Sequence, residues 1–398
     1  MCAVTSLTWS SLFLTVPPRE RRNTVAMATE TPAAQASPRA TAAGDAACFA
    51  DYARPVKAAL DAALAAHLAD VAASVRHLPA DVQASVEAVR DLTLRGGKRL
   101  RAVLLAATYD ACGGEGGAAK VVLAGVAFEL LQSYLLIHDD WMDADDVRRG
   151  GPSVPAMLRA HFGAASARTA DAFTILAGDL AAGLALEALG RVPVSPDRVA
   201  AAAREMGRIQ RDVVLGQMCD LQGELTHEPP TEAAVDLTHT LKTGSYTVRG
   251  PVAIGAHLAG ASDALVLALT AFADPLGIAF QLRDDVLGTF GDPDRTGKPA
   301  TGDIRQGKRT GLIAALAADT SQATATLVAR TFGNAEASPA DVDALVALLV
   351  SSGARARVER RIDALLAQAL RALEGADISS SGRAVLESAA YTLVHREK

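Results

Sequence analysis

Hydrophobic residues recur at intervals of three and four from about residue 52 to the end of the chain. This spacing places apolar side chains on one face of a helix, so it predicts a succession of amphipathic helices. Glycine and proline clusters such as GGEGG and GDPDRTGKP separate the helical stretches. Helices are expected near residues 56–75, 81–94, 99–111, 118–142, 168–190, 196–224, 231–243, 263–288, 311–331, 339–350, 353–373 and 380–395.

The same pattern contains no alternating strand of useful length and no repeat at a fixed period. It therefore predicts one all-α domain whose helices pack antiparallel around a central cavity. Composition agrees, because half of the residues are hydrophobic, alanine and leucine are abundant, and only 4% are aromatic. No uninterrupted apolar run is expected to be long enough to form a transmembrane segment.

Charge and cysteine content limit the function classes. The net charge is −6 and no basic stripe carries interleaved aromatic residues, so nucleic acid is not an expected partner. The four cysteines lack the spacing of a zinc site or a disulfide scaffold; they are Cys2, Cys48, Cys112 and Cys219. They fit a reducing compartment, and we expect a cytoplasmic protein.

Residues 1–47 are expected to form a disordered tail ahead of a single folded domain at 48–398. Residues 28–47 are mostly Ala, Thr, Pro and Ser, which leave little to bury. The earlier stretch SLTWSSLFLTV is apolar but has no basic residue before it, so it is a poor signal peptide. A disordered leader, or translation from Met27, are the other interpretations.

An acidic cluster follows an apolar run in LLIHDDWMDADDVRRGG, residues 135–151. Each helical residue turns by about 100°, and Asp139, Asp140 and Asp143 are expected on one face. Neighbouring carboxylates raise one another's pKa unless a cation neutralises them. A set of oxygen ligands favours magnesium, which also binds phosphate oxygens. A solvated acidic helix end is the alternative.

A second apolar helix runs into adjacent aspartates, Asp284 and Asp285, within GIAFQLRDDVLGTFGD. Two such helices facing each other across a cavity would each hold part of a metal cluster. The alternative is that they are two unrelated acidic helix ends.

Basic residues lie beside the glycine-rich turns and the acidic helices. Arginine forks and lysine charges are the groups that bind phosphate. Any one of them is explained as solvated surface charge, but together with the carboxylates they indicate a site for more than one diphosphate. These residues are Lys98, Arg99, Arg101, Arg148, Arg149, Lys242, Lys298 and Lys308.

Taken in order, these motifs resemble those of the trans-isoprenyl diphosphate synthases of the polyprenyl synthetase family. The resemblance covers about residues 50–395 and rests on GGKRLR, HDDWMDADDVRRG, GQMCD, KTGSY, QLRDD and GKPATGDIRQGK. It implies the isoprenoid synthase fold, a catalytic domain at 48–398 and a homodimer. It also implies about three magnesium ions in each active site.

The resemblance assigns a role to each matching position. It makes metal ligands of Asp139, Asp140, Asp143, Asp284 and Asp285. It places the allylic diphosphate at Arg148, Lys242, Lys298 and Lys308, and isopentenyl diphosphate at Lys98, Arg101, Gln132 and Arg149. It puts Lys242, Thr243 and Gln281 beside the reacting carbons, and Gln217 and Asp220 on the cavity wall.

The chain departs from the family pattern at two places. The fifth position of the second motif, often aspartate, is Gly288, so metal binding must rest on Asp284 and Asp285, with Asp303 as a further candidate. After RRG the family usually has Lys-Pro-Thr and a later histidine, where this chain has Gly151, Pro152, Ser153 and Pro155. The second departure lies outside the metal and arginine set, and activity is expected to survive it.

The resemblance implies a magnesium-dependent prenyltransferase. It would condense isopentenyl diphosphate with dimethylallyl, geranyl or farnesyl diphosphate to give linear all-trans geranylgeranyl diphosphate; farnesyl diphosphate synthase is the alternative. In the family, residues just before the first aspartate line the tunnel for the growing chain, and here they are Tyr134 and Leu135, with Leu131 about one turn deeper. One aromatic residue, and no two-residue insertion in the first motif, favour the geranylgeranyl product. His138 is expected to pack rather than to transfer protons.

Two remoter functions are also considered. A class I terpene cyclase shares the helical fold, but its second metal motif begins with Asn-Asp. The two asparagines of this chain, Asn23 and Asn334, precede no aspartate. A non-catalytic partner subunit keeps the fold and loses metal ligands, whereas both aspartate pairs are present here.

Overall fold

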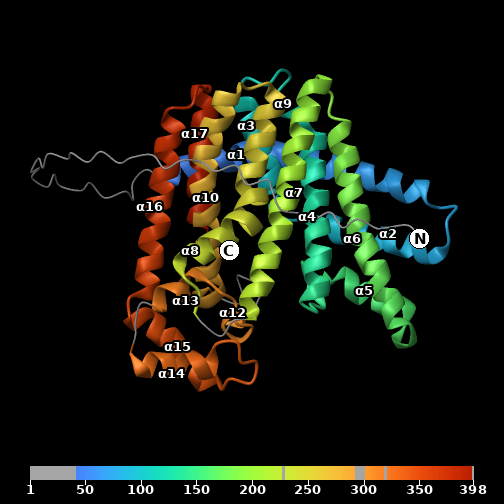
Figure 1. The fold of residues 1–398 in the computed structure, drawn as a ribbon. Coiled ribbons are helices and arrows are strands. Elements are labelled where there is room, and N and C mark those ends of the chain that lie inside the picture. The colour runs from blue at the N-terminus through green and yellow to red at the C-terminus, as the bar shows by residue number, and fades with distance from the viewer. Residues whose placement is uncertain (1–41, 226–228, 292–300, 318–320, 397–398) are drawn as a thin grey trace, which may run out of the picture. The chain divides into compact units, whose positions relative to one another are not determined.

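The structure, a computed structural model, describes residues 42–225, 229–291, 301–317 and 321–396. Its described elements are almost all helical (Figure 1). The first are α1 (Ala42–Ser74), α2 (Ala80–Leu94), α3 (Leu100–Ala111), η2 (Ala118–Val121), α4 (Val122–Met142), β1 (Val147–Arg148), β2 (Gly151–Pro152), α5 (Val154–Phe162), η3 (Ala164–Ser166), α6 (Ala167–Gly190) and α7 (Pro196–Glu224). The chain continues with α8 (Glu232–Thr238), η4 (His239–Arg249), α9 (Gly250–Ala259), α10 (Asp263–Phe290), α12 (Gly302–Arg305), α13 (Gly311–Leu316), α14 (Gln322–Thr331), α15 (Pro339–Ser351), α16 (Ala354–Glu374) and α17 (Ser380–Val394).

The predicted all-α class is confirmed, and three local differences accompany it. Helix α1 begins at Ala42, inside the predicted tail 1–47, of which residues 1–41 lie outside the described part of the chain. The stretch predicted as one helix at 311–331 is described as α13 and α14, with 318–320 not described. The hydrophobic pattern also missed α5, α9 and the two-residue strands β1 and β2.

The sequence pattern missed α5 and α9 because glycine and proline were interpreted as breaks between helices. In this chain proline also occurs in the first turn of a helix. Ser153 caps α5 by accepting a hydrogen bond from the N–H of Ala156, and a proline follows in the first turn. Pro251 occupies the first turn of α9. In α5 proline suits this position because its missing N–H would have no partner within the helix and its φ is already helical, whereas α9 follows η4 directly.

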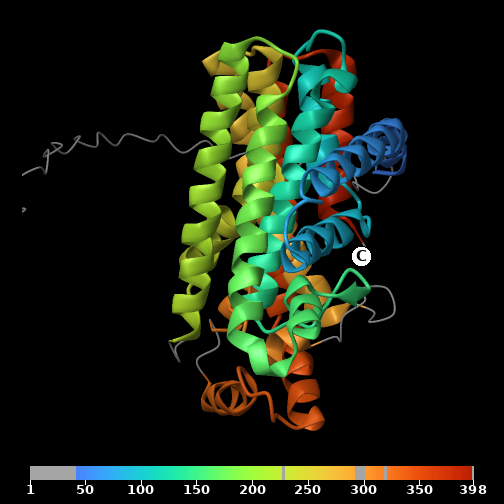
Figure 2. The same cartoon turned by 90° about the vertical axis from the view of Figure 1, so that its right-hand side faces the viewer.

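The described helices of Ala40–Lys398 bury two hydrophobic cores. One core lies mainly among α3, α9, α10, α16 and α17, and the other mainly among α1, α2, α3, α4, α6 and α7. Figures 1 and 2 show α4, α6 and α7 running side by side, and α6 contacts both of the others. Helix α10 packs against α16 and η4. This packing brings the ends of α4, α7 and α10 to η4, where the site described below is formed.

Three helical segments are long and apolar enough, by length and composition, to be candidates for membrane spans: Ala118–Met142, Ala164–Gly190 and Asp263–Phe290. By length and composition, these three segments differ from the expectation that no apolar run is long enough to span a membrane. Their most apolar windows are 67%, 44% and 56% buried inside the protein. A helix with neighbours on most sides is hydrophobic all round, which fits the first and third segments, whereas more than half of the Ala164–Gly190 window is exposed.

Candidate active site

The first acidic motif lies where α4 ends. Asp139 is in the last turn and Asp143 is the C-cap, with the N–H of Asp143 donating to the Asp139 carbonyl at 2.8 Å. The partly exposed carboxylate of Asp139 lies 3.8 Å from Nζ of Lys242. Burial and the charge of Asp139 raise the pKa of Asp143, while Lys242 and Lys308 act to lower it. Carboxylates and ammonium groups therefore share this end of α4.

Asp140 does not share that face. Its side chain is completely buried and forms an ion pair with Arg148, whose Nε donates to Oδ1 at 2.6 Å. Consecutive helical residues point about 100° apart, so directing Asp139 toward Lys242 turns Asp140 into the protein. Burial raises the pKa of Asp140 to about 6, against the effect of Arg148. The prediction that the three aspartates present one face is therefore wrong for Asp140.

The two arginines after this motif lie in the β1–β2 hairpin and point to different elements. Pairing of the strands leaves Arg149 and Gly150 as a two-residue turn, and both have positive φ, 53° and 72°. A type I′ turn requires that geometry. Arg148 binds Asp140 of α4 and also Asp145, at 3.0 Å, whereas Arg149 donates to a backbone carbonyl of α2. The turn thus assigns consecutive arginines to separate sides of the hairpin.

The second acidic motif divides in the same way. Asp284 of α10 is half-exposed and forms an ion pair with Arg396 near the C-terminus. Asp285 is buried and accepts hydrogen bonds from Nε2 of Gln281 at 3.1 Å and from the N–H of Gly311 at 2.9 Å. Burial raises the pKa of Asp285 to about 7, against the effect of these hydrogen bonds. Asp285 therefore anchors the start of α13 to α10, which is not the arrangement predicted for a metal ligand.

Gly288, the departure within the second motif, makes room for another carboxylate. A Cβ at Gly288 would lie 2.4 Å from Oδ2 of Asp303, so a side chain at this position would collide with Asp303. Asp303 belongs to α12 and forms an ion pair with Lys308 at 3.3 Å. A carboxylate that the second motif lacks is therefore supplied beside it by α12.

Close glycine contacts hold η4 between α7 and α10. A Cβ at Gly216 of α7 would lie 2.3 Å from the backbone nitrogen of Lys242, and a Cβ at Gly277 of α10 would lie 2.7 Å from Cα of Gly244. Glycine is required because any side chain would push these helices apart. Helix η4 is a π-helix, a form that often occurs at functional sites. The local geometry therefore fixes the position from which Lys242 extends.

Lys242 is held by carboxylates from two helices. Its Nζ donates to Asp220 of α7 at 2.6 Å and lies 3.8 Å from Asp139 of α4. Burial alone would lower the pKa of Lys242, but Asp220 and Asp139 outweigh it and the pKa is raised. A protonated Lys242 thus links the ends of α4 and α7, and it lies beside the predicted metal ligand Asp139.

A second basic group surrounds the loop between α2 and α3. Nη1 of Arg149 donates to the Leu92 carbonyl at 3.3 Å. In the first turn of α3, Nη2 of Arg101 donates to Thr247 at 2.9 Å, and the guanidinium group lies 4.3 Å from the ring centroid of Tyr246. Arg149 and Arg101 are therefore oriented by neutral partners, which leaves their charge available to an anion.

The charge balance around Arg149 favours an anionic ligand. Burial lowers the pKa of Arg149, and the charge of Glu129 opposes this. Three more guanidinium groups reinforce the lowering: those of Arg99, Arg101 and Arg148. A diphosphate placed here would relieve the repulsion among these cations.

Residues 82–349 match the family model described as polyprenyl synthetase, and this match spans more than half of the chain. The chain belongs to the polyprenyl synthetase family. These proteins are trans-isoprenyl diphosphate synthases, and the predicted family is thereby confirmed.

Proteins of this family with assigned names are similar to the chain. It is 34% identical over 226 residues to a short chain isoprenyl diphosphate synthase of Methanocaldococcus jannaschii, covering 57% of this chain and 64% of that protein. It is 34% identical over 287 residues to a geranylgeranyl diphosphate synthase of Mycobacterium tuberculosis, covering 70% and 75%. It is also 34% identical over 216 residues to a (2E,6E)-farnesyl diphosphate synthase of Mycobacterium bovis, covering 54% and 55%. The chain thus spans between about half and three quarters of the length of these relatives.

Solved structures of the family share the fold. A geranylgeranyl pyrophosphate synthase of Corynebacterium glutamicum, complexed with isoprenyl diphosphate and magnesium, is 33% identical, with a TM-score of 0.79 over 87% of this chain and 99% of that chain. A geranylgeranyl pyrophosphate synthetase of Pyrococcus horikoshii is 27% identical, with a TM-score of 0.73 over 88% and 98%. The predicted isoprenoid synthase fold is confirmed.

Other predicted site residues lie on the same elements or beside them. Gln132 is half-buried on α4, Gln217 is half-buried on α7, and Thr243 follows Lys242 in η4. Lys98 is exposed in the loop between α2 and α3. Lys298 lies outside the described residues.

The residues predicted to set product length lie on a buried side of α4. Leu131 and Tyr134 belong to the second hydrophobic core, and the half-buried Leu135 packs against it. Tyr134 meets the ring of His138 edge-on, with centroids 4.9 Å apart, and the His138 ring lies 3.0 Å from the Ile175 carbonyl of α6. The predicted packing role of His138 agrees with these contacts.

Several residues of the site escaped the sequence analysis. Glu129 is an isolated acid in the apolar run VAFELLQ of α4, and that isolation was a usable sign of a buried partner. Gly216 and Gly277 lie inside helical patterns, where an isolated glycine often marks a close packing contact. Arg396 gave no local sign, because its contact with Asp284 joins positions far apart in the chain.

Proposed function

We propose that this protein is a short-chain prenyltransferase that joins isopentenyl diphosphate to an allylic diphosphate and yields linear all-trans geranylgeranyl diphosphate. The observation that carries the proposal is the presence of two separate basic groups. Lys242 and Lys308 lie beside the acidic motifs, whereas Arg101 and Arg149 surround the loop between α2 and α3. Two diphosphate sites are what a condensation of two diphosphate substrates needs. The similarity to a short chain isoprenyl diphosphate synthase and to a geranylgeranyl diphosphate synthase supports the same reaction.

The carboxylates of the two motifs fit magnesium. No group of three or more potential ligands is preassembled among the described residues. Magnesium usually binds through one or two carboxylates and completes its shell with water and phosphate oxygens, so a preassembled cage is not required. We propose Asp139, Asp143 and Asp284 as the ligands, with Asp303 as an additional carboxylate beside Asp284. About three ions would then bind together with the allylic diphosphate.

In the proposed reaction the carbon–oxygen bond of the allylic substrate breaks, and its electron pair leaves with the diphosphate. Magnesium, when bound, supplies positive charge that stabilises this leaving group. Lys242 and Lys308 add fixed positive charge on the same side. The double bond of isopentenyl diphosphate then attacks the allylic cation, and a proton passes to the departing diphosphate.

Polar side chains beside the reacting carbons would steady the cation. The amide of Gln281 is oriented by its hydrogen bond to Asp285, which leaves its carbonyl oxygen as the group with negative partial charge. Thr243 contributes a hydroxyl from η4. No nucleophilic side chain is needed in this scheme, so no covalent enzyme intermediate is expected.

Incubation of purified protein with magnesium, labelled isopentenyl diphosphate and each allylic primer in turn tests the proposal. Elongated linear product is expected, and chromatography measures its length. Cyclic hydrocarbon would indicate a terpene cyclase, and no turnover with any primer would indicate a non-catalytic partner subunit.

Product length is expected to depend on Tyr134. Tyr134→Ala removes a buried ring from the side of α4 that packs toward α6, which opens space for a longer chain. The variant should release products at least one isoprene unit longer than wild type. Tyr52→Ala, which removes an aromatic side chain on α1 whose hydroxyl donates to Asp110, is the control and should leave product length unchanged. Equal product distributions in wild type and Tyr134→Ala would refute this length assignment, and wild-type product limited to farnesyl diphosphate would favour the alternative activity.

We also propose a cytoplasmic homodimer. The free cysteines Cys48, Cys112 and Cys219 are consistent with a reducing compartment. Helix α6 exposes Ile175, Leu176 and Leu186, with 61% of Leu176 accessible. An apolar strip on one helix suits burial against the same strip of a second copy.

Leu176→Glu is expected to convert the dimer to monomer, because a buried carboxylate without a partner opposes association. Light scattering coupled to size exclusion measures the mass. Leu237→Glu, on α8 and similarly exposed, is the matched control and should remain dimeric. A wild-type monomer, or a Leu176→Glu dimer, would contradict this assignment.

A further inference from the structure

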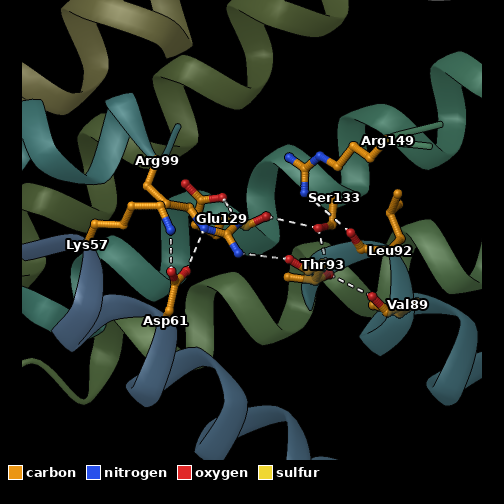
Figure 3. Close-up of polar contacts among 9 residues, drawn as sticks. All are labelled: Lys57, Asp61, Val89, Leu92, Thr93, Arg99, Glu129, Ser133 and Arg149. Atoms are coloured by element: carbon orange, nitrogen blue, oxygen red, sulfur yellow. Dashed lines mark hydrogen bonds and ion pairs between the residues drawn. The ribbon is translucent and has the colours of Figure 1, made fainter. Parts of the chain in front are cut away.

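Arg99, in the loop between α2 and α3, has a buried guanidinium group held by three helices (Figure 3). Nε donates to Asp61 of α1 at 2.9 Å, Nη2 donates to the Thr93 carbonyl of α2 at 3.1 Å, and Nη1 pairs with Glu129 of α4. Arg99 and Glu129 are only 4% and 2% exposed. Burying a charge pair so deeply costs hydration, so stability alone does not account for it.

Further hydrogen bonds tie this group to the surrounding helices. The Ser133 hydroxyl donates to the Glu129 carbonyl at 3.0 Å and lies 2.7 Å from the Thr93 hydroxyl. Nζ of Lys57 lies 2.5 Å from Asp61. Figure 3 shows Asp61 of α1, the Thr93 carbonyl of α2 and Glu129 of α4 around the Arg99 guanidinium. Its position is therefore determined by several elements at once.

The backbone at Arg99 needs such an anchor. Gly96 and Gly97 have φ of 90° and 145°, and Arg99 itself has φ of 54° at the N-cap of α3. A residue with a side chain rarely adopts this left-handed region, and it persists only where the surroundings impose it. The contacts of the Arg99 side chain impose it here, so they determine the path of the loop.

This loop shapes the second basic group. Lys98 immediately precedes Arg99, and Arg101 follows in the first turn of α3. A Cβ at Gly97 would lie 4.0 Å from both the Arg99 and the Arg149 guanidinium groups. The Arg99 and Arg149 guanidinium groups therefore approach the same point beside Gly97.

We propose that Arg99 and Glu129 form a positioning pair for the isopentenyl diphosphate pocket. Arg99 fixes the loop so that Lys98 and Arg101 converge with Arg149, and Glu129 neutralises a guanidinium that would otherwise repel Arg149. Arg99 itself does not touch the substrate, because its donors are directed to Asp61, Thr93 and Glu129. The inference rests on the proposed function, which assigns isopentenyl diphosphate to this group.

The electrostatic part of the proposal agrees with the surroundings of Arg149. Among the groups that act on the pKa of Arg149, Glu129 is the carboxylate that raises it, whereas Arg99 and Arg101 lower it. Removing the charge of Glu129 therefore leaves Arg99 and Arg149 to repel each other across Gly97.

Four variants test the pair: Arg99→Met, Arg99→Lys, Glu129→Gln and the double variant Arg99→Met with Glu129→Met. Replacement of both members by apolar residues of similar size restores stability where single replacement does not. The double variant is therefore expected to melt near wild type while its apparent KM for isopentenyl diphosphate rises about tenfold, because a displaced loop would weaken a contact that Lys98, Arg101 or Arg149 makes with the diphosphate. The KM for the allylic substrate should change less than about twofold. Arg99→Lys keeps the charge opposite Glu129 and should recover part of the affinity.

Arg383→Met is the matched control, because Arg383 binds backbone carbonyls of α16 and its C-terminal turn without contact to the basic group. It should lower the melting temperature without altering the ratio of the two KM values. A double variant with wild-type KM for isopentenyl diphosphate, or with equal rises for both substrates, would overturn the proposal. If wild type shows no turnover, the proposed function fails instead. Calorimetric binding of isopentenyl diphosphate then decides the inference, which predicts weaker binding to the double variant than to wild type.

Discussion

Replacing Asp139 or Asp284 by alanine is expected to lower the condensation rate about a thousandfold or more, while the protein still folds. Both carboxylates are partly accessible, unlike Asp140 and Asp285, and each lies beside a basic group, Lys242 or Arg396. Without either carboxylate the site would hold less magnesium, and the departing diphosphate would then have less positive charge around it. Rates under saturating magnesium and both substrates measure the effect, and circular dichroism checks the fold.

The buried aspartates provide the contrast for this experiment. Asp140→Ala leaves Arg148 buried without its principal partner and should lower thermal stability as well as rate. Asp146→Ala is the matched control from the same segment, because exposed Asp146 pairs with Arg159 at the surface. Binding of Mn²⁺ with inorganic pyrophosphate, followed by electron paramagnetic resonance, reports on the metal without turnover. Near wild-type rates in Asp139→Ala and Asp284→Ala would remove the proposed metal site.

The same measurement addresses the departure at Gly288. If Asp303 supplies the carboxylate that the second motif lacks, Asp303→Asn should weaken Mn²⁺ binding in the presence of pyrophosphate. A side chain at position 288 would collide with Asp303. Gly288→Asp should therefore restore Mn²⁺ binding only when Asp303 is also replaced by alanine. Unchanged Mn²⁺ binding in Asp303→Asn would indicate that the two acidic motifs bind the metal without Asp303.

Separate effects on the two substrates are expected from Arg149→Ala and Lys242→Ala. Arg149 belongs to the basic group around the loop between α2 and α3, so its loss should raise the apparent KM for isopentenyl diphosphate about a hundredfold. Lys242 lies beside Asp139, so its loss should mainly weaken the allylic substrate and lower the rate. Steady-state kinetics with each substrate varied in turn separates the two effects.

Lys242 also joins Asp220 to Asp139, so its removal has a structural consequence that needs a control. Asp220→Asn keeps Lys242 and loses one of its anchors. It should impair the allylic substrate less than Lys242→Ala does. If Arg149→Ala and Lys242→Ala raise both KM values equally, the assignment of the basic groups to separate substrates is wrong.

The two members of each aspartate pair have different surroundings in the structure. Asp139 and Asp284 are accessible, whereas Asp140 and Asp285 are buried and bound by Arg148 and by Gln281 with Gly311. Neighbouring positions on a helix point about 100° apart, and here that separation directs Asp140 and Asp285 into the protein. The second aspartate of each pair instead fixes the segment that carries other parts of the site.

The sequence by itself determined the helical class, the limits of most long helices and the family. Hydrophobic periodicity depends on positions a few residues apart, and six ordered motifs are local in the chain, so both can be recognised without the fold. The elements missed were short or had proline in the first turn, as α5 and α9 do. Their helical state depends on caps and on packing rather than on periodicity.

The tertiary structure alone decided which charges face each other. Lys242 meets Asp220 and Asp139, Arg396 meets Asp284, and Arg99 meets Asp61 and Glu129, all across long separations in sequence. The strength of a charge pair depends on the distance between its members and on their burial, and neither is a property of a local motif. Close packing through Gly216, Gly244 and Gly277 sets those distances around η4. The sequence therefore supplied the chemical groups of the site, and the packing of distant helices supplied their partners.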